Sequence, residues 1–429
     1  MRCSTVSWVV FINLMLFGMG SYFYMVWQYR QSPPKQSFPN ISTYDNQIFL
    51  YNRGFLPNKK PTLLWRTKHA SPSNVTYVKR SMPRFPSLHS HQAQFDGKFY
   101  TCLKNESAEE CRKKTSQFKK KILVQLSNSV MEESNVLKQG NSNNSYNVHY
   151  AGPREDFNDK PPKQVLCELL STKLETLRRA DIASTEPLRA SMPKRHFFEN
   201  RIFNSCVVVA SSGALKGSNM GKFIDSHDVV LRFNRAPTRT FAEDVGAKTT
   251  VRLLNSQVVT KEEFGFLKSS LYKNVSLVVW DPSNYSASLD EWIQSPEHDL
   301  FPNFIQYRKQ EAKPRIYMIN PLTIWDVWDF LQRNTRLRLR KNPPSSGFLG
   351  IRLLLPHCNL VDVVEYVPSS RVTKRCHYYD PEQNEACTFG VWHPLSAEKL
   401  LTYHMNEASD HEVFQGGFVR LRGSKMIKC

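Results

Sequence analysis

The chain has 429 residues and a formal net charge of +20, from 58 Lys and Arg against 38 Asp and Glu, and it contains nine cysteines. A basic surplus of this size favours an anionic partner: nucleic acid, an acidic glycan, an anionic lipid surface or an acidic small molecule. No Cys-x-x-Cys pair occurs, which argues against a zinc site of the common paired kind.

The chain begins with a candidate membrane anchor. Residues 6–27 are 22 consecutive positions without Asp, Glu, Lys, Arg or His. A helix of that length spans about 33 Å, enough for the hydrocarbon core of a bilayer. The run ends in Tyr and Trp, which suit a membrane interface, rather than in the small residues of a signal-peptide cleavage site. We therefore predict a cytoplasmic tail over residues 1–5 and an uncleaved transmembrane signal-anchor over residues 6–27.

The charges on either side of the anchor are nearly balanced, so its orientation is inferred from the residues on its C-terminal side. Eight cysteines lie there, an even number typical of disulfides formed in an oxidising compartment. Their spacing leaves the pairing open, although Cys102 with Cys111 and Cys376 with Cys387 are near enough to close short hairpins. The Asn-x-Ser/Thr glycosylation acceptors are Asn40, Asn74, Asn105, Asn143, Asn274 and Asn284. A lumenal location is predicted, which argues against a nucleic-acid partner.

Residues 28–161 are rich in Pro, Ser, Asn and Lys, a composition typical of an extended lumenal stem. Residues 118–130 and the Cys102 and Cys111 pair are the places within it that are capable of local structure. From residue 162 to residue 429 the pattern is that of one α/β domain. Apolar runs alternate with helix-length segments, which indicates a mostly parallel sheet covered on both faces. The expected strands are residues 207–210, 229–233, 250–254, 276–280 and 361–367.

Ser211, Ser212 and Gly213 follow the first expected strand and precede a helix. The unpaired backbone N–H groups of a helix N-terminus favour an anion, so this corner is a candidate phosphate or carboxylate site. It matches neither the dinucleotide-binding glycine fingerprint nor the P-loop. The alternative is that Gly213 only allows the helix to pack closely against its neighbours.

Asn234 and Asn255 end the next two expected strands. Ligands of open α/β sheets bind outside the carboxyl ends of the strands. A side-chain amide offers both a donor and an acceptor, which suits a sugar hydroxyl or a pyrimidine edge. Without such a ligand, both residues would serve only as turn residues.

Ser345, Ser346 and Gly347 follow two prolines at the start of another expected helix. Two hydroxyls and a glycine at a helix entrance form a second candidate cradle for phosphate or carboxylate. The alternative is that Ser346 is only an N-cap.

Two histidines near the C-terminus have acidic residues close by in the sequence. His377 comes three residues before Asp380, and His393, followed by Pro394, comes five residues before Glu398. His393 stands at the expected start of a helix and is suited to act as a general base, whereas a structural role is the alternative for either histidine. No Asp-x-Asp motif occurs, and we predict no catalytic metal.

Taken in order, these segments resemble the four sialyl motifs of the animal sialyltransferases (glycosyltransferase family 29), and closely those of the β-galactoside α-2,6-sialyltransferases. The large, small, third and very small motifs match residues 206–257, 343–365, 377–380 and 393–398. The resemblance covers residues 162–429. It implies a GT-A-like (Rossmann-like) catalytic domain in a single-pass type II Golgi membrane protein. The implied reaction is an inverting, metal-independent transfer of sialic acid from CMP-sialic acid to the 6-hydroxyl of galactose-terminated glycans.

The resemblance also implies roles for single residues. His393 would deprotonate the acceptor hydroxyl, and Gln257 would contact the acceptor galactose. The implied donor-binding residues are Ser211, Asn234, Asn255, Ser345, Ser346, Gly347, His377, Thr388, Trp392 and Lys399. The implied disulfides are Cys167–Cys429, Cys206–Cys358 and Cys376–Cys387, which leaves Cys102 and Cys111 without a counterpart.

Two alternatives stay open at this point. The four motifs are shared with sialyltransferases of other specificity, α-2,3 to galactose or α-2,6 to N-acetylgalactosamine, although residues 258–341 favour the galactoside α-2,6 group. A binding protein without turnover is the other alternative. The joint presence of His393, Glu398 and the Ser345 cradle argues against it, because binding alone needs no base.

Overall fold

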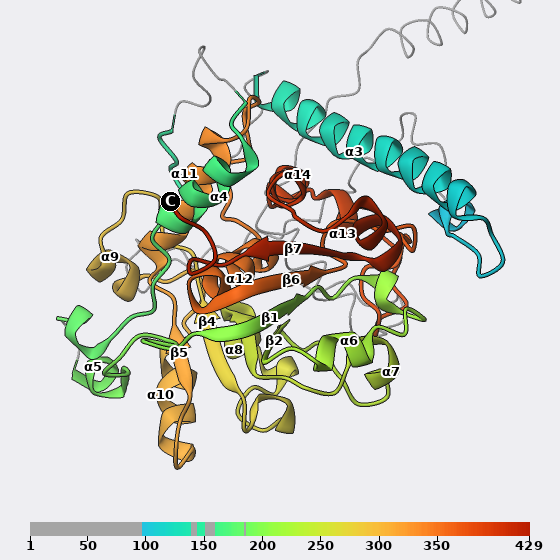
Figure 1. The fold of residues 1–429 in the computed structure, drawn as a ribbon. Coiled ribbons are helices and arrows are strands. Elements are labelled where there is room, and N and C mark those ends of the chain that lie inside the picture. The colour runs from blue at the N-terminus through green and yellow to red at the C-terminus, as the bar shows by residue number, and fades with distance from the viewer. Residues whose placement is uncertain (1–96, 139–143, 151–158, 184–185) are drawn as a thin grey trace, which may run out of the picture. The chain divides into compact units, whose positions relative to one another are not determined.

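The computed structural model describes residues 97–138, 144–150, 159–183 and 186–429 (Figure 1). The expected anchor, residues 6–27, lies outside the described residues, as do the acceptors Asn40, Asn74 and Asn143. In the described part of the chain, no helix combines the length and the apolar character needed to cross a membrane. The acceptors within it are exposed: Asn105, Asn274 and Asn284.

A seven-stranded sheet in the order β5-β4-β3-β2-β1-β6-β7 forms the centre of the domain. Strands β1 to β6 run parallel, and only β7 is antiparallel, to β6. The strands are β1 (Phe203–Val209), β2 (Val229–Phe233), β3 (Val251–Asn255), β4 (Ser276–Trp280), β5 (Ile316–Met318), β6 (Cys358–Val364) and β7 (Phe418–Arg422). The mostly parallel α/β sheet expected from the sequence is confirmed.

The central strands are buried on both faces, as parallel strands covered by helices must be. Every residue of β2 and of β4 is buried. Side chains alternate between the two faces of a strand. Val207 and Val209 accordingly share one apolar cluster with Leu215, Ile224 and Val230. A larger cluster gathers around β4 and includes Leu277, Val279, Trp292 and Phe304.

Helices surround the sheet. The longer ones are α3 (Ala108–Lys138), α4 (Pro162–Ser171), α10 (Phe301–Gln310), α11 (Pro321–Arg333), α12 (Ser346–Leu354) and α14 (Leu395–His404). The shorter ones are α5 (Glu186–Ser191), α6 (Gly221–Asp225), α7 (Ala242–Val245), α8 (Ser256–Thr260), α9 (Leu289–Gln294) and α13 (Ala386–Phe389). Single turns are η2 (Gly97–Tyr100), η3 (Arg179–Asp181), η4 (Gly213–Leu215), η5 (Glu262–Phe264), η6 (Ser270–Tyr272), η7 (Leu355–His357) and the π-helical η8 (Glu412–Gly416).

The strand order creates a place for a ligand between β1 and β6. From β1 the chain adds β2 to β5 on one side, and β6 then lies on the other side of β1. Such a reversal opens a crevice at the carboxyl ends of the two strands. Helix α12 packs across β1, β2, β3 and β6. Its Gly350 lies so close to the sheet that an added Cβ would stand 3.0 Å from the Phe233 ring.

Residues 97–138, which the sequence placed in an extended stem, are packed against the domain that we expected to begin at residue 162. Helix α3 (cyan in Figure 1) contacts α14 and η8. Phe118, Ile122 and Leu126 are fully buried at a spacing of four residues, which places them on one face of the helix. The segment contains many lysines, and this polar composition masks the apolar spacing in the sequence. The start of the predicted stem, residues 28–96, lies outside the described residues.

Four disulfides join described residues. They link Cys167 to Cys429, Cys206 to Cys358, Cys376 to Cys387 and Cys102 to Cys111. The first three are the pairs that the resemblance implied. Cys206 lies in β1, and Cys358 is the first residue of β6. Their disulfide therefore joins β1 to β6, the two strands on either side of the crevice.

Candidate active site

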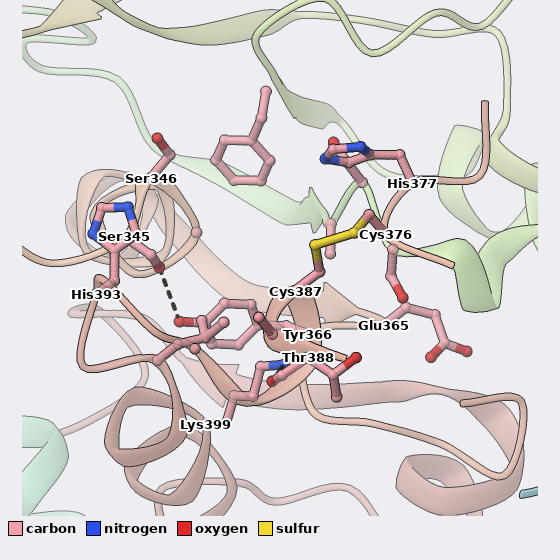
Figure 2. Close-up of a pocket in the computed structure, with 18 of the residues that line it drawn as sticks. Ser345, Ser346, Glu365, Tyr366, Cys376, His377, Cys387, Thr388, His393 and Lys399 are labelled. Carbon is pink, nitrogen blue, oxygen red and sulfur yellow. Dashed lines mark hydrogen bonds between the residues drawn. A yellow bond between two sulfur atoms is a disulfide. The ribbon is translucent and has the colours of Figure 1, made fainter. Parts of the chain in front are cut away.

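A cavity of about 270 Å³ opens at the carboxyl ends of β1 and β6 (Figure 2). The sequence-predicted residues that line it are Ser211, Asn234, Asn255, Ser345, Ser346, Gly347, His377, Thr388, Trp392, His393 and Lys399. In Figure 2, Ser345, Ser346 and His393 lie on one side of the cavity, and His377 lies on the other with the Cys376–Cys387 disulfide. The proposed base and every proposed donor-binding residue therefore share one space.

Gln257 is the exception among the predicted site residues. It belongs to α8, is 4 % exposed and is not part of the cavity lining. Its Oε1 accepts a hydrogen bond from Lys261 Nζ at 2.7 Å, one helical turn later. Gln257 is therefore buried outside the lining of this cavity.

The N-terminus of α12 forms the cradle that the sequence indicated. Ser345 is the N-cap, because its Oγ accepts a hydrogen bond from Phe348 N at 3.2 Å, and Ser346 is the first helical residue. Ser346 Oγ in turn accepts a hydrogen bond from Trp280 Nε1 at 3.0 Å. A Cβ on Gly347 would stand 2.5 Å from the Tyr366 ring, so only glycine fits there without movement. Free N–H groups of this first turn favour an anionic group.

A buried carboxylate holds the cradle from behind. Glu398, on α14, is fully buried. It accepts hydrogen bonds from Ser345 N at 2.7 Å, from Ser345 Oγ at 2.5 Å and from Tyr366 OH at 2.6 Å. Burial raises the pKa of the Glu398 carboxyl, and the bonds from Ser345 and Tyr366 oppose that rise. Glu398 thereby fixes the start of α12 relative to α14.

His393 has the protonation state of a base. Its Nδ1 lies 2.8 Å from the Pro343 carbonyl oxygen, which can only accept, so Nδ1 carries the proton. Burial lowers the pKa of His393 to about 4, although the bond to Pro343 opposes the shift. The ring is therefore neutral near pH 7, and its Nε2 has the lone pair that a general base needs. Trp392 packs edge-on against the ring, with centroids 4.3 Å apart.

Lys399 brings a cation to the same cavity. Its side chain is 6 % exposed, and Nζ donates a hydrogen bond to Thr388 O at 2.5 Å and lies 5.9 Å from the centre of the Tyr366 ring. Burial lowers the pKa of Lys399 to about 7, opposed by the charges of Glu398 and Glu365. An anionic ligand would favour the charged form.

His377 closes the opposite side. Its ring stacks on Tyr379 at 5.1 Å, and its Nδ1 is buried without a hydrogen-bond partner. Burial lowers the pKa of His377 to about 4. The neighbouring backbone is tied to the end of β1, because Tyr378 N donates to Ser211 O at 3.2 Å. A neutral histidine in this position is suited to hydrogen bonding or stacking rather than to holding a charge.

The two asparagines at the strand ends are linked to each other. Asn234 Oδ1 accepts a hydrogen bond from Asn255 N at 3.1 Å, and Asn255 Oδ1 caps α8 by accepting from Val258 N at 3.2 Å. Asn234 has φ +44°, a conformation that asparagine tolerates better than most residues. The buried Arg252 holds this backbone through its bond to Asn234 O at 2.8 Å. With both amide oxygens engaged, the amide NH₂ groups are the hydrogen-bonding groups available to a ligand.

Sequence reasoning missed part of the lining. Glu365 and Tyr366 follow the end of β6, and Pro368, Val372 and Thr373 come from the segment after it. The rule that found Asn234 and Asn255 would have found the first two residues as well. It failed because the expected strand was continued to residue 367, whereas β6 ends at Val364.

The described residues offer few groups for a metal. Glu365 is the single carboxylate in the lining of this cavity, and it is ion-paired with Arg371 at 2.6 Å. The described part of the chain has one group of three potential ligands, Cys102, Cys111 and His411, and its two cysteines are bonded to each other. The donor set that lines the cavity does not fit a divalent cation, which takes mainly carboxylate and carbonyl oxygens.

Comparison with known proteins was consistent with these observations. The chain matches the model of glycosyltransferase family 29 (sialyltransferase) over residues 136–409. It is 41% identical over 291 residues to the human protein named beta-galactoside alpha-2,6-sialyltransferase 2, an alignment that covers 67% of this chain and 54% of that protein. Identity is 46% over 224 residues to human beta-galactoside alpha-2,6-sialyltransferase 1, covering 52% of this chain and 55% of that one. For the Bos taurus beta-galactoside alpha-2,6-sialyltransferase 2 it is 45% over 243 residues, covering 57% and 48%. The chain spans about half the length of these relatives.

Proposed function

The chain belongs to glycosyltransferase family 29, the sialyltransferases, and from that premise we propose that it transfers sialic acid from CMP-sialic acid to the 6-hydroxyl of terminal β-galactose. The names of its relatives support the linkage and the acceptor. The observation that carries the proposal is the geometry of the cavity. It combines a neutral histidine, a helix N-terminus that favours anions and a buried lysine in one space.

The proposed donor matches this combination. CMP-sialic acid presents a phosphate and a sialyl carboxylate, both anionic, and the Ser345 cradle with Lys399 would hold them. The NH₂ groups of Asn234 and Asn255, together with Ser211, would hold the nucleotide. His377, Thr388 and Trp392 would complete the donor site. Gln257 would contact the acceptor galactose from outside the lining of this cavity.

Proton and electron movements balance with His393 as the base. Nε2 would take the proton of the acceptor hydroxyl as its oxygen attacks the anomeric carbon of sialic acid from the face opposite CMP. The bond to the CMP phosphate oxygen breaks, and that oxygen leaves with the electron pair as part of a phosphate anion. The positive charge of Lys399 and the N–H groups at the start of α12 would stabilise the leaving phosphate. The reaction would thus invert the anomeric centre and proceed without a metal.

We further propose a GT-A-like fold and a lumenal catalytic domain in a type II Golgi membrane protein. The ligand crevice at the strand-order reversal supports the first. Four disulfides and three exposed glycosylation acceptors support a location in an oxidising compartment.

One assay tests the reaction. The full chain would be incubated with CMP-sialic acid and glycans that end in β-galactose or in N-acetylgalactosamine, with and without EDTA, and the product linkage would be determined by NMR. We expect α-2,6-linked sialic acid on galactose at a rate that EDTA does not change. A different linkage or acceptor would identify another sialyltransferase specificity, donor binding without product would indicate a binding protein, and loss of activity in EDTA would overturn the metal-free mechanism.

The pH dependence of kcat/KM should show two limbs. The pKa of His393 is lowered to about 4, so protonation inactivates the base only below that pH. The pKa of Lys399 is lowered to about 7, so the lysine loses its charge, and with it attraction for an anionic donor, as pH rises through 7. We expect kcat/KM for the donor to be highest between about pH 5 and pH 7. Lys399→Met should lower that plateau and remove the alkaline limb. A wild-type profile that stays level from pH 7 to pH 9 would contradict the role of Lys399.

A further inference from the structure

One wall of the cavity is held by a part of the chain that the sequence placed in the stem. This wall segment, residues 368–373, contributes Pro368, Val372 and Thr373 to the lining. It contains neither helix nor strand, so side-chain contacts must hold its shape. Ser369 and Ser370, at its centre, are fully buried or nearly so.

Gln415, on η8, joins the wall segment to residues 97–102, which we call the arm. Its Oε1 accepts hydrogen bonds from Ser370 Oγ at 3.2 Å and from Cys102 N at 3.1 Å. Its Nε2 donates to Tyr100 O at 3.0 Å and to Thr115 Oγ1, on α3, at 3.1 Å. One side-chain amide therefore connects the wall segment, the arm and α3.

The arm also touches the wall segment directly. Thr101 Oγ1 donates a hydrogen bond to Ser370 Oγ at 3.2 Å. At Gly97 the two backbones are so close that an added Cβ would stand 2.4 Å from Ser370 O. The Cys102–Cys111 disulfide fastens the end of the arm to α3. Neither cysteine has a counterpart in the motifs that carry the family resemblance.

A second route leads from Gln415 to the lining of the cavity. Its main-chain oxygen accepts a hydrogen bond from Arg371 Nη1 at 2.7 Å. Arg371 also pairs with the buried carboxylate of Glu365, which lines the cavity. Ser370 N donates to Phe414 O at 2.8 Å beside it. The contacts of η8 therefore reach both the wall segment and the residue that follows β6.

We propose that Gln415 and the disulfide-fastened arm are positioning elements that set the shape of the wall segment and, through it, the affinity for the nucleotide-sugar donor. The inference rests on the proposed function, because it takes the occupant of the cavity to be CMP-sialic acid. Neither the arm nor Gln415 lines the cavity, so neither touches the reacting atoms. Their loss should weaken donor binding and leave the chemical step intact.

Gln415→Glu is the decisive variant, because it keeps the size and the acceptor atoms but places a carboxylate against Tyr100 O, to which the amide donates. In the full chain we expect KM for CMP-sialic acid to rise about tenfold and kcat to change less than about twofold. The reason is that the wall segment would contribute equally to binding of the donor and of the transition state, so its distortion weakens both alike. CMP binding by calorimetry should weaken by a similar factor, and amide hydrogen exchange across residues 368–373 should become faster. The matched control is Leu103→Ser, next to the arm, whose side chain is 68% exposed; it should behave as wild type.

The double variant Cys102→Ser/Cys111→Ser opens the disulfide without changing Gln415 and should show the same change in KM and in hydrogen exchange. Wild-type donor KM in both variants, or loss of kcat with unchanged KM, would overturn the proposal. Failure of both variants to yield folded protein would also overturn it, since the arm would then serve folding as a whole. If the wild-type chain itself does not bind CMP, the proposed function fails instead, and the two failures are thereby distinguished.

Discussion

Replacing His393 by alanine is expected to lower kcat by about 10²–10⁴-fold, the usual contribution of a positioned general base. The bond from Nδ1 to Pro343 O fixes the tautomer, and the lowered pKa of about 4 keeps the ring neutral. The side chain stands beside the Ser345 cradle but makes no hydrogen bond to it. The donor site should therefore survive, and calorimetry should find CMP affinity within about twofold of wild type.

His404→Ala is the matched control, because His404 lies on the adjoining helix α14, is exposed and binds Lys160 O, outside the cavity. It should retain full activity. Near-normal turnover of His393→Ala, measured with saturating donor and acceptor, would show that another group removes the proton. Equal loss of turnover in both histidine variants would point to a fault in folding rather than in the chemistry.

Replacing Glu398 by alanine is expected to lower the free energy of unfolding by about 3 kcal/mol or more, because it leaves buried donors without a partner. Glu398 is fully buried and accepts from Ser345 N, Ser345 Oγ and Tyr366 OH. The same change frees the start of α12, so we also expect CMP binding to be lost under conditions where the variant is still folded. Urea unfolding and calorimetry measure the two effects.

Glu407→Ala provides the contrast. Glu407 pairs with Arg422 at 2.7 Å, but both side chains are well exposed, and such surface pairs contribute only about 0–1 kcal/mol. The Glu398 interpretation would be wrong if its alanine variant unfolded at the same urea concentration as Glu407→Ala. If the folded Glu398→Ala protein bound CMP as tightly as wild type, the Glu398 carboxylate would not be needed to shape the Ser345 cradle.

The strands show which parts of the sheet can be predicted from the local apolar pattern of the sequence. The runs at residues 229–233 and 276–280 coincide with β2 and β4, because strands buried on both faces read as continuous apolar segments. The strands β5 and β7 were not predicted. Both lie at the edges of the sheet, β5 has three residues, and the residues of β7 are only alternately buried. Short or half-covered strands do not produce a continuous apolar run.

The amino-acid sequence by itself predicted the α/β class and several of the residues that line the cavity, among them Asn234, Asn255 and Ser345. It could do so because those positions follow from local order along the chain: Asn234 comes after a strand, and Ser345 comes before a helix. Only the tertiary structure decided that Gln257 is buried outside the cavity lining, that Glu398 holds Ser345 across 53 residues, and that residues 97–138 pack against the domain. These features depend on which buried donors and acceptors meet, and that is settled when distant segments pack together rather than by the pattern within any one segment.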